Sequence, residues 1–473
     1  METEYGFEGR QLTMWDYLGM VAAEQQEQPG ELSRRRIATT TDTINVMWNS
    51  KMLDHIVQEN NLFAAAKKVK ANKGAAGIDE MTVRDLYPWL ATHYDELAEQ
   101  ILSGKFKPNP VRRVQIPKDK PGEFRNLGIP TVVDRCVQQA IATELTPIYE
   151  AQFSDNSFGF RPGRGCADAL QRCLELANEG YTYVVSMDLR KYFDTVNHSK
   201  LIEVLGRTIK DGRVISLIHK YLNAGVLVDG CFARTEEGVP QGGPLSPLLG
   251  NVMLNELDKE LERRGHKFVR YADDAIIFCR SQKAAERTLE HIIPFIENKL
   301  FLQVNREKTM VSEIQGIKYL GHGFYTRKGV YRLRVHPKSV AKMRLKLKEL
   351  LRKGRGIGNK DRKLQVRQYM EGWINFFQAA DMKSLMNEVE IWYRRRIRAI
   401  YWKQWKRVRT RYRKFRSLKI PEKFVHMMAN CRKGPWRASM MLNRALTKDW
   451  IHKGQGWMSF VGYYSERHMK FEN

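Results

Sequence analysis

The sequence predicts an α+β protein whose mixed centre is followed by a helical, strongly basic C-terminal region. Strand-like and helix-like segments alternate between about residue 55 and residue 335. After residue 337 the pattern is almost entirely helical. The chain has 473 residues, of which 42% are apolar. A chain of this length is expected to form roughly two to four domains with cores of their own.

Helices are expected where apolar residues recur at helical spacing. This spacing is found in residues 55–74, 134–150 and 283–302, and the first of these ends at a Gly stop signal. Residues 243–264 predict another helix, because Pro and Ser lie at its start.

Strands are expected in four places. Residues 105–130 are rich in Pro and Gly, which suits two strands joined by a turn. The segment 181–193 (YTYVVSMDLRKYF) is typical of a strand that runs into a turn. Residues 267–279 predict a strand around the YADD segment, and two further strands are expected near 309–334.

The positive charge of the chain is concentrated in one segment. The formal net charge is +27 and the pI is about 9.8, which favours a polyanionic partner, most simply nucleic acid. An anionic membrane surface is the alternative. Residues 341–420 hold 25 Lys and Arg against 6 Asp and Glu, a net +19 that leaves +8 for the other 393 residues.

Several other classes of protein are disfavoured. The sequence has no apolar run long enough to span a bilayer, and its N-terminus (METEYGFEGRQ) begins acidic, without the apolar core of a signal peptide. We therefore expect a soluble, cytoplasmic protein without membrane contact. None of the six cysteines forms a C-x-x-C pair, so neither a zinc ribbon nor a disulfide framework is indicated.

Two acidic sites lie at the ends or in the middle of strand-like runs. Asp273 and Asp274 interrupt the apolar segment KFVRYADDAIIFC, and Asp188 ends the run YVVSM. A hairpin turn or a helix cap explains such residues in many proteins. A metal site is the other explanation, because clustered carboxylates repel one another unless cations lie between them. Carboxylate oxygens suit Mg²⁺, and two such ions about 4 Å apart are a recurring device for phosphoryl transfer.

The order of motifs resembles that of a known family. From residue 72 onward the chain reads NKGAAGIDEM, VRRVQIPK, FRNLGIPTVVDRCVQQAI, SFGFRPGRG, SMDLRKYFDTVNH, PQGGPLSPLL, YADD, LQVNREKT and IKYLGHGF. Together these motifs resemble the reverse transcriptases, and more narrowly the group II intron-encoded reverse transcriptases or intron maturases. The later segments GWINFF and IWYRRRIRAIYWKQWK resemble the maturase thumb. No nuclease-type His/Cys cluster follows, which is similar to the bacterial, endonuclease-lacking type.

The resemblance implies a fold, an activity and a set of partners. The fold would be a right-hand polymerase, with fingers and palm built on antiparallel sheet, a helical thumb and a small C-terminal domain. The activity would be RNA-directed DNA synthesis with two Mg²⁺ ions. The partners would be an RNA template, group II intron RNA, a DNA primer or target, and dNTPs. The oligomeric state stays open.

The same resemblance predicts four parts of the chain. An N-terminal extension would cover residues 1–45, and fingers and palm would cover 46–335. A helical maturase or thumb domain would follow over 336–420. A small C-terminal nucleic-acid-binding domain would occupy 421–473.

By resemblance, Asp188, Asp273 and Asp274 would be the catalytic, metal-binding aspartates. Asp188 and Asp273 are the stronger candidates for bridging ligands. Asp194 lies in the same motif as Asp188, and its neighbours favour a capping role.

The resemblance also implies that five residues bind the nucleotide: Lys118, Arg125, Phe193, Gln241 and Lys308. The first two are cations of a basic hairpin that would contact the triphosphate, with Lys120 and Arg113 as rivals for the first. The aromatic ring would exclude a ribose 2′-OH, or else pack in the core. The glutamine lies in a Gly-rich turn before a helix, where glycines allow close approach. The last lysine would donate a proton to pyrophosphate, or lie on the surface.

The basic C-terminal segment interleaves cations with Trp and Tyr, a pattern typical of nucleic-acid contact. The predicted nucleic-acid-binding residues are Arg394, Arg395, Arg396, Lys403, Lys406 and Arg407. Two other functions stay open beside the polymerase and maturase: an RNA-binding splicing cofactor with an idle polymerase, and a reverse transcriptase co-opted for DNA repair or defence.

Overall fold

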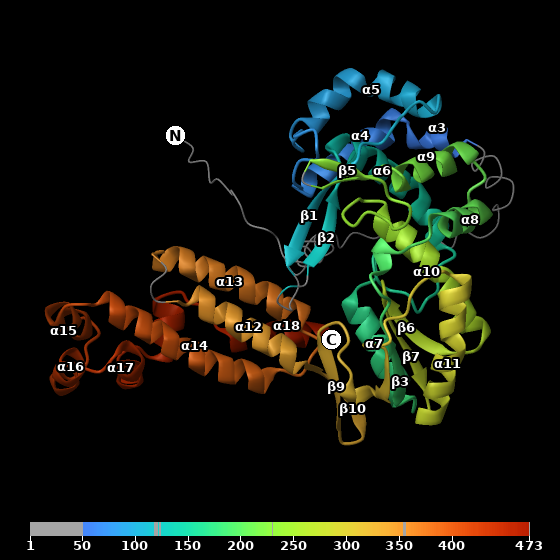
Figure 1. Ribbon diagram of the computed structural model, residues 1–473. Helices are drawn as coiled ribbons and strands as arrows, with labels where there is room; N and C mark the ends of the chain where they lie inside the picture. Colours follow the sequence, from blue (N-terminus) through green and yellow to red (C-terminus); the bar gives the residue numbers. More distant parts are fainter. Residues whose placement is uncertain (1–50, 118–121, 123, 229, 353–355, 473) are drawn as a thin grey trace. The chain divides into compact units, whose positions relative to one another are not determined.

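The computed structural model describes residues 51–117, 122, 124–228, 230–352 and 356–472 (Figure 1). The predicted N-terminal extension, residues 1–45, lies outside these ranges. The described residues divide into two compact units, of which the first ends at Ile314 and the second begins at Gln315.

A group of helices and a mixed sheet form one end of the first unit. The helices are α3 (Met52–Ile56), α4 (Glu59–Ala71), α5 (Leu86–Leu102), α6 (Val132–Glu150) and α9 (Gly212–Leu222). Helix α4 packs on α5 and α6, and α3 packs on α6 and α9. The sheet, called here the first sheet, has the order β2-β1-β4-β5. Its strands are β1 (Val111–Pro117), β2 (Phe124–Ile129), β4 (Val226–Val228) and β5 (Cys231–Ala233). The β1–β4 pair is parallel and the other two pairs are antiparallel.

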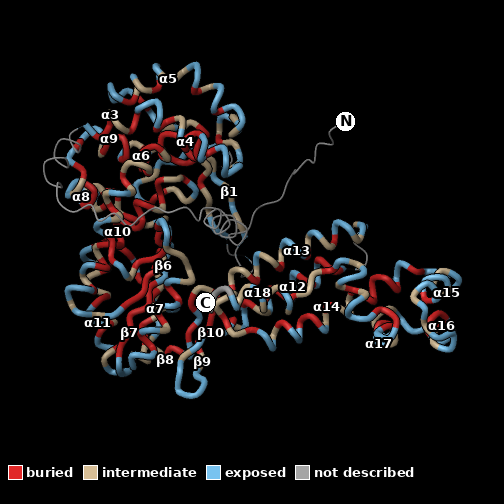
Figure 2. The backbone as a smooth tube through the Cα atoms, turned by 180° about the vertical axis from the view of Figure 1, so that it is seen from behind, coloured by how far each residue is buried: buried red, intermediate tan, exposed pale blue. Residues whose placement is uncertain are grey.

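An antiparallel sheet, called here the central sheet, forms the rest of this unit. It has the order β6-β7-β3-β8. Its strands are β3 (Tyr183–Met187), β6 (Lys267–Tyr271), β7 (Asp274–Cys279) and β8 (Met310–Glu313). The helices around it are α7 (Cys166–Asn178), α8 (His198–Thr208), α10 (Ser246–Arg263) and α11 (Gln282–Lys299), with short 3₁₀ turns at Tyr192–Asp194 and Ile314–Gly316. Helix α11 packs on β3, β7 and β8, while α7 and α10 pack on β6. Strands β6 and β7 are therefore buried along most of their length (Figure 2).

The second unit starts with an antiparallel hairpin and continues as helices. The hairpin consists of β9 (His322–Arg327) and β10 (Val330–Val335). The helices are α12 (Pro337–Leu350), α13 (Asn359–Phe376), α14 (Lys383–Gln404), α15 (Val408–Arg416), α16 (Glu422–Ala429), α17 (Pro435–Met441) and α18 (Phe460–Glu472), with short turns of helix at Leu442–Arg444 and Trp450–Gly454. Helix α14 is central, because α17 and α18 both pack on it, and α18 also packs on α13.

A buried carboxylate ties the start of α18 to α14. Glu390 accepts hydrogen bonds from the Ser459 hydroxyl at 3.0 Å and from the Val461 amide at 2.9 Å. Its Oε1 atom lies 2.8 Å from Arg394 Nη1 and 3.3 Å from His452 Nε2. Burial opposes ionisation, yet His452, the Val461 amide and the Ser459 hydroxyl together lower the pKa of Glu390 to about 2. The ranges 336–420 and 421–473 thus belong to one compact unit, and the predicted division into four parts stays a prediction.

The predicted α+β class is confirmed, and two details of the strand prediction are wrong. Residues 267–279 form two strands, β6 and β7, because the chain reverses at Ala272 and Asp273. The region 309–334 contributes to three strands, β8, β9 and β10, where two were expected. Over the described ranges, no helix is long and apolar enough to cross a membrane.

Candidate active site

The three predicted aspartates lie at one end of adjoining strands of the central sheet. Strands β3 and β7 pair antiparallel up to Met187 and Ala275, so Asp188 and Asp274 are the next residues beyond that pair. Strands β6 and β7 are joined by a two-residue turn whose second residue is Asp273. The hairpin turn and the metal site were alternative explanations of this motif, and the structure accommodates both in the same residues.

Asp273 is held where ionisation is unfavourable. Burial is the largest cause and raises the pKa of its carboxyl group, and the negative charge of Asp188 raises it further. The positive charge of Arg125 acts in the opposite direction. Asp188 and Asp273 are both half-buried, whereas Asp274 is exposed. The two half-buried carboxylates are therefore close enough to repel each other, and Arg125 on β2 lies within electrostatic range.

Asp188 is held by the segment that contains LQVNREKT. Its Oδ2 atom accepts a hydrogen bond from Asn305 Nδ2 at 2.8 Å and lies 3.3 Å from Lys308 Nζ. The Asn305 amide donates to the Asp188 carbonyl at 2.8 Å, and the Asp188 amide donates to the Thr309 hydroxyl at 3.2 Å. Lys308 was predicted near the nucleotide, and the structure places its ammonium beside Asp188.

The donor set fits a divalent cation in its chemistry. Asp188 and Asp273 offer hard oxygen ligands whose mutual repulsion a cation would relieve. Within the described part of the chain, no group of three or more His, Cys, Asp or Glu side chains is arranged to hold a metal ion. The side chains thus provide a pair of carboxylates, to which the exposed Asp274 is adjacent in the chain.

Phe193 lies in the 3₁₀ turn that follows β3. Its ring is half-buried and contacts Tyr192 edge-on, with 5.1 Å between the ring centroids. A Cβ atom added at Gly250 of α10 would lie 3.1 Å from the Phe193 ring. Because the ring is only partly covered and has a tight neighbour behind it, a core-packing role and a nucleotide-contact role are compatible.

Gln241 connects the Gly-rich turn before α10 to the first sheet. Its carbonyl accepts a hydrogen bond from the Gly128 amide of β2 at 2.7 Å. Its Nε2 atom lies 3.4 Å from Asp194 Oδ1. A Cβ atom at Gly242 would meet the Gly128 carbonyl oxygen at 2.5 Å, and Gly242 has φ +124°. The close approach that the sequence predicted at this Gly-rich turn is, at Gly242, an approach of protein backbone.

Lys118 and its rival Lys120 lie outside the described residues. Arg125 and Arg113 are described, and both belong to the antiparallel β1–β2 pair.

A buried network that the sequence reasoning missed holds the turn with Asp273. The Arg270 guanidinium donates from Nε and Nη2 to the carboxylate of Asp258 and from Nη1 to Asn251 Oδ1 at 2.9 Å. The same Nη1 donates to the Ala272 carbonyl at 3.0 Å. On the other side, Gly159 lies against the turn, because a Cβ there would come within 3.0 Å of the Tyr271 carbonyl carbon.

This network enforces an uncommon backbone. Ala272 has φ +56°, a conformation that costs a non-glycine residue about 1–3 kcal/mol and persists when its surroundings fix it. A signal was present in the sequence, since Arg270 interrupts an apolar strand and a buried guanidinium needs partners. Nothing in the sequence identified Asp258 as that partner. Likewise, nothing in the sequence identified Asn305 as a hydrogen-bond partner of Asp188.

Comparison with known proteins identifies the family. Residues 116–324 match the reverse transcriptase (RNA-dependent DNA polymerase) family, and residues 340–418 match the maturase-specific domain of group II introns. The chain is 34% identical to protein YkfC of Escherichia coli K12 over 339 residues, which cover 63% of this chain and 89% of YkfC. The chain belongs to the group II intron-encoded reverse transcriptases. The predicted recognition is thereby confirmed.

Another relative of this group II intron-encoded protein is longer. The intron-encoded protein LtrA of Lactococcus lactis subsp. cremoris is 29% identical over 346 residues, so the matched region spans 59% of this chain and 57% of LtrA. Among solved structures, a chain of a partial Cas6-RT-Cas1–Cas2 complex is 23% identical, with a TM-score of 0.34 over 52% of this chain and 43% of that one. A likeness at that level carries no argument.

All six predicted nucleic-acid-binding residues of this group II intron-encoded protein fall within the maturase-specific match. Arg394 is paired with buried Glu390. The Arg395 guanidinium lies 3.9 Å from the centre of the Trp436 ring, and that of Arg396 lies 5.8 Å from it. These three arginines are half-buried, whereas Lys403, Lys406 and Arg407 are exposed. The contacts give the arginines a packing role, and their contact with nucleic acid stays a prediction.

Proposed function

We propose that this protein copies RNA into DNA by nucleotidyl transfer, and that it binds group II intron RNA to assist splicing and mobility. The observation that carries the proposal is the pairing of Asp188 with Asp273 at the end of the central sheet, inside the reverse transcriptase match. In the reaction, the 3′-hydroxyl oxygen of a primer forms a bond to the α-phosphorus of a dNTP. The bond to the pyrophosphate oxygen breaks, and the hydroxyl proton leaves.

Different residues of this site would act on the attacking hydroxyl and on the leaving pyrophosphate. Asp188 and Asp273 would hold two Mg²⁺ ions, with Asp274 as a further candidate ligand. When bound, Mg²⁺ lowers the pKa of the attacking hydroxyl and neutralises charge on the leaving pyrophosphate. Arg125 would contact the triphosphate from β2. Lys308 orients Asp188 at 3.3 Å and would supply a proton to the pyrophosphate.

Phe193 would select deoxyribonucleotides over ribonucleotides. Its half-buried ring follows Asp188 in the same loop, so the part left exposed is available to contact the sugar of a nucleotide. A ring in contact with C2′ has no room for a 2′-hydroxyl, which is the group that separates the two classes of nucleotide.

Primer extension on an RNA template tests the proposal. The wild-type protein should make cDNA from dNTPs only when Mg²⁺ is present. Asp273→Asn should lower the rate at least 1,000-fold and leave the affinity for the primer–template within about threefold. Asp155→Asn is the matched control, because the Asp155 side chain is 94% exposed and forms an ion pair only with Arg164 among the residues that the structure describes.

The outcomes separate the candidate functions. Extension that persists in Asp273→Asn would refute the role of the aspartate pair. If the wild-type protein extends no primer yet binds intron RNA tightly, the function is that of a splicing cofactor with an idle polymerase. Extension without affinity for any intron RNA would favour a co-opted polymerase of repair or defence.

A further inference from the structure

One short turn contacts Asp188 through three of its residues. The turn is closed by the amides of Lys308 and Thr309, which donate to the Asn305 carbonyl at 3.2 and 2.9 Å. These three residues occupy positions i, i+3 and i+4, a spacing that places side chains on one face of a helical turn. The sequence NREKT therefore directs an amide, an ammonium and a hydroxyl group to the same aspartate.

The backbone of Asp188 is fixed by hydrogen bonds to this turn and to the residues before it. The Asn305 amide donates to the Asp188 carbonyl at 2.8 Å, and the Asp188 amide donates to the Thr309 hydroxyl oxygen at 3.2 Å. Two residues after the aspartate, the Arg190 amide donates to the Gln303 carbonyl at 2.8 Å. The main chain is thus held at and beyond Asp188, and the rotation of its side chain is what remains to be set.

Two side chains of the turn reach the same carboxylate oxygen of Asp188, and they differ in how firmly they are held. Asn305 is half-buried, and its Nδ2 atom donates to Oδ2 at 2.8 Å. The Lys308 ammonium lies 3.3 Å from Oδ2, but its side chain is 64% exposed. Over the described ranges, no hydrogen bond to Oδ1 is found. An exposed ammonium on a flexible stem leaves its partner easily, whereas a half-buried amide stays.

A metal ion at Asp188 would compete with Lys308 and not with Asn305. The two oxygens of a carboxylate share one negative charge, and like charges within about 6 Å of each other are unfavourable. The ammonium and a divalent cation therefore oppose each other at this side chain. A neutral amide has no such conflict, and a hydrogen bond to a ligating carboxylate is the usual arrangement around a metal.

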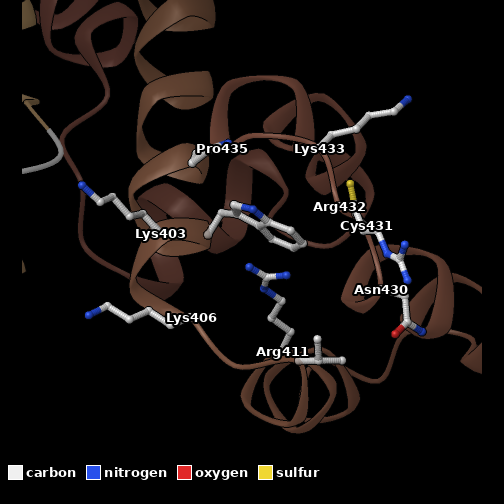
Figure 3. A pocket seen from close by; sticks show the side chains of 10 residues that line it. Lys403, Lys406, Arg411, Asn430, Cys431, Arg432, Lys433 and Pro435 are labelled. Atoms are coloured by element: carbon white, nitrogen blue, oxygen red, sulfur yellow. The ribbon is translucent and has the colours of Figure 1, made fainter.

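The positive net charge of the chain does not by itself explain where Lys308 lies. At the end of α14 in the second unit, five cations and no acidic residue line a hollow of about 670 Å³. Figure 3 shows the Lys433 side chain of this hollow pointing away from those of Lys403 and Lys406. Lysines in this chain thus extend away from other cations, whereas Lys308 lies against a carboxylate of the candidate active site.

We propose that Asn305 is a permanent positioning residue that leaves Oδ1 of Asp188 for a divalent cation, and that Lys308 is a temporary counter-ion which this cation displaces. Lys308 keeps the carboxylate oriented until the cation binds, and its ammonium then turns to other partners. The inference rests on the proposed function for the identity of the cation as Mg²⁺. Two neighbours of one oxygen should therefore affect metal affinity with opposite signs.

Binding of Mn²⁺ to the full chain, without nucleotide or primer, tests both roles apart from polymerase activity. Free Mn²⁺ is measured by electron paramagnetic resonance during a titration, and binding that is lost in Asp273→Asn is assigned to the aspartate pair. The test variants are Lys308→Gln and Asn305→Ala. Arg306→Gln is the matched control, because it removes the same charge from the same turn. The Arg306 side chain is 65% exposed and pairs with Glu297 at 2.8 Å.

Lys308→Gln should bind Mn²⁺ about threefold to fivefold more tightly, because a competing charge of an exposed ion pair is removed. Asn305→Ala should bind at least tenfold more weakly, the usual consequence of losing a hydrogen bond to a metal ligand. Arg306→Gln should change the affinity less than about 1.5-fold, since solvent screens a charge that faces away. Unchanged or weaker binding in Lys308→Gln would overturn the displacement, and unchanged binding in Asn305→Ala would overturn the positioning role.

The reactivity of the Lys308 amine provides a second, local readout with Mg²⁺ itself. Acetylation by an N-hydroxysuccinimide ester, followed residue by residue with mass spectrometry, should be at least threefold faster in Mg²⁺ than in EDTA. Lys283, an exposed lysine of α11, should react at the same rate in both. The response of Lys308 should disappear in Asp273→Asn.

The two readouts separate this inference from the proposed function. If the protein makes cDNA with Mg²⁺ but Lys308 reacts at the same rate with and without the ion, the displacement is overturned and the proposed function stands. If both the Mn²⁺ affinities and the Lys308 reactivity respond as expected while no cDNA is made, the inference stands and the polymerase function fails.

Discussion

Arg270 and Asp258 form a fully buried ion pair, with Arg270 Nη2 2.5 Å from Asp258 Oδ2 and side chains that are 1% and 0% exposed. Burial raises the pKa of Asp258, while the adjacent guanidinium favours its ionised form. The pair matters for the site because Arg270 also donates to the carbonyl of Ala272, the residue before Asp273. A contact in the core thereby fixes the turn that carries a proposed metal ligand.

Separating stability from activity tests this positioning role. Asp258→Asn should destabilise the first unit by roughly 3–5 kcal/mol, the usual consequence of breaking a buried pair. The double variant Arg270→Met/Asp258→Leu should recover most of that free energy of unfolding, because no buried charge remains. It should still extend primers about 100-fold more slowly, since the Ala272 carbonyl has lost its donor.

Denaturant unfolding and primer extension of the same preparations make the comparison. Arg172→Met/Glu175→Leu is the matched control, because it removes an ion pair between solvent-accessible side chains of α7 in the same unit. The control should leave both quantities nearly unchanged. Full activity in a stable Arg270→Met/Asp258→Leu protein would contradict the positioning role.

The raised pKa of Asp273 predicts how Mg²⁺ and pH act on stability. A carboxyl group whose pKa is higher in the folded protein favours folding at low pH, and this contribution is lost as pH rises through the raised pKa. At neutral pH the ionised Asp273 is therefore unfavourable without metal. Asp273→Asn should raise the melting temperature by a few degrees in EDTA.

Added Mg²⁺ should relieve the destabilisation that ionised Asp273 causes in the wild-type protein. It should stabilise the wild-type protein at pH 7, have little effect near pH 4, and have a much smaller effect on Asp273→Asn at either pH. Differential scanning fluorimetry with EDTA or Mg²⁺ measures all of these. A wild-type stabilisation by Mg²⁺ that the variant shares in full would place the ion elsewhere.

Gly250 controls the position of the Phe193 ring. A Cβ at this position would lie 3.1 Å from Phe193 and 3.4 Å from Tyr192, so Gly250→Ala must displace a ring by a few tenths of an ångström. We expect a change of at least fivefold in the ratio of kcat/KM for dNTPs to that for rNTPs. Phe193→Ala should increase ribonucleotide incorporation further, and steady-state kinetics with matched dNTP and rNTP check both.

Gly206→Ala is the control for the effect of alanine itself. Gly206 lies in α8, and a Cβ there would meet nothing within 4 Å. This variant should gain about 0.5–1 kcal/mol of stability and keep its selectivity. Unaltered selectivity in both Phe193→Ala and Gly250→Ala would remove the ring from nucleotide choice.

Local patterns predicted the elements of the fold better than they predicted its turns. The helices and the aspartates at strand ends follow from periodicity and from the cost of burying a carboxylate. The sequence left the break between β6 and β7 open, because both arms are apolar and the two aspartates suit either a hairpin turn or a metal site. The positive φ of Ala272 is imposed by Arg270 and Gly159, and the latter lies 113 residues earlier in the chain.

The candidate active site also depends on contacts between residues that lie far apart in the sequence. Arg125 comes near Asp273 because β2 is bound to the turn before α10, through the Gly128 amide and the Gln241 carbonyl. No spacing in the sequence reports a contact between strands so far apart. Nucleic-acid contact by Arg394–Arg396 stays a prediction, and the sequence did not reveal that two of their guanidinium groups lie near Trp436.

The buried His322 side chain is expected to make the stability of the second unit sensitive to acid. It is fully buried beside Phe376 and Phe377, its Nδ1 lies 2.8 Å from the Leu320 carbonyl oxygen, and its Nε2 has no hydrogen-bond partner among the described residues. Burial lowers its pKa to about 4. The unfolded chain therefore takes up a proton at a higher pH than the folded one does. Stability is fully present above about pH 6.5 and falls by roughly 3 kcal/mol as the pH drops to about 4.

His322→Phe should remove most of that dependence on pH. The variant should be about 1 kcal/mol less stable at pH 7, because the hydrogen bond to Leu320 is lost, and it should be relatively more stable at pH 4.5. Hydrogen exchange of β9, β10 and the end of α13, followed by mass spectrometry between pH 7 and pH 4.5, measures the local opening. The strands of the central sheet in the same samples are the internal control. A wild-type second unit whose opening free energy stays constant over this range would contradict the role of His322.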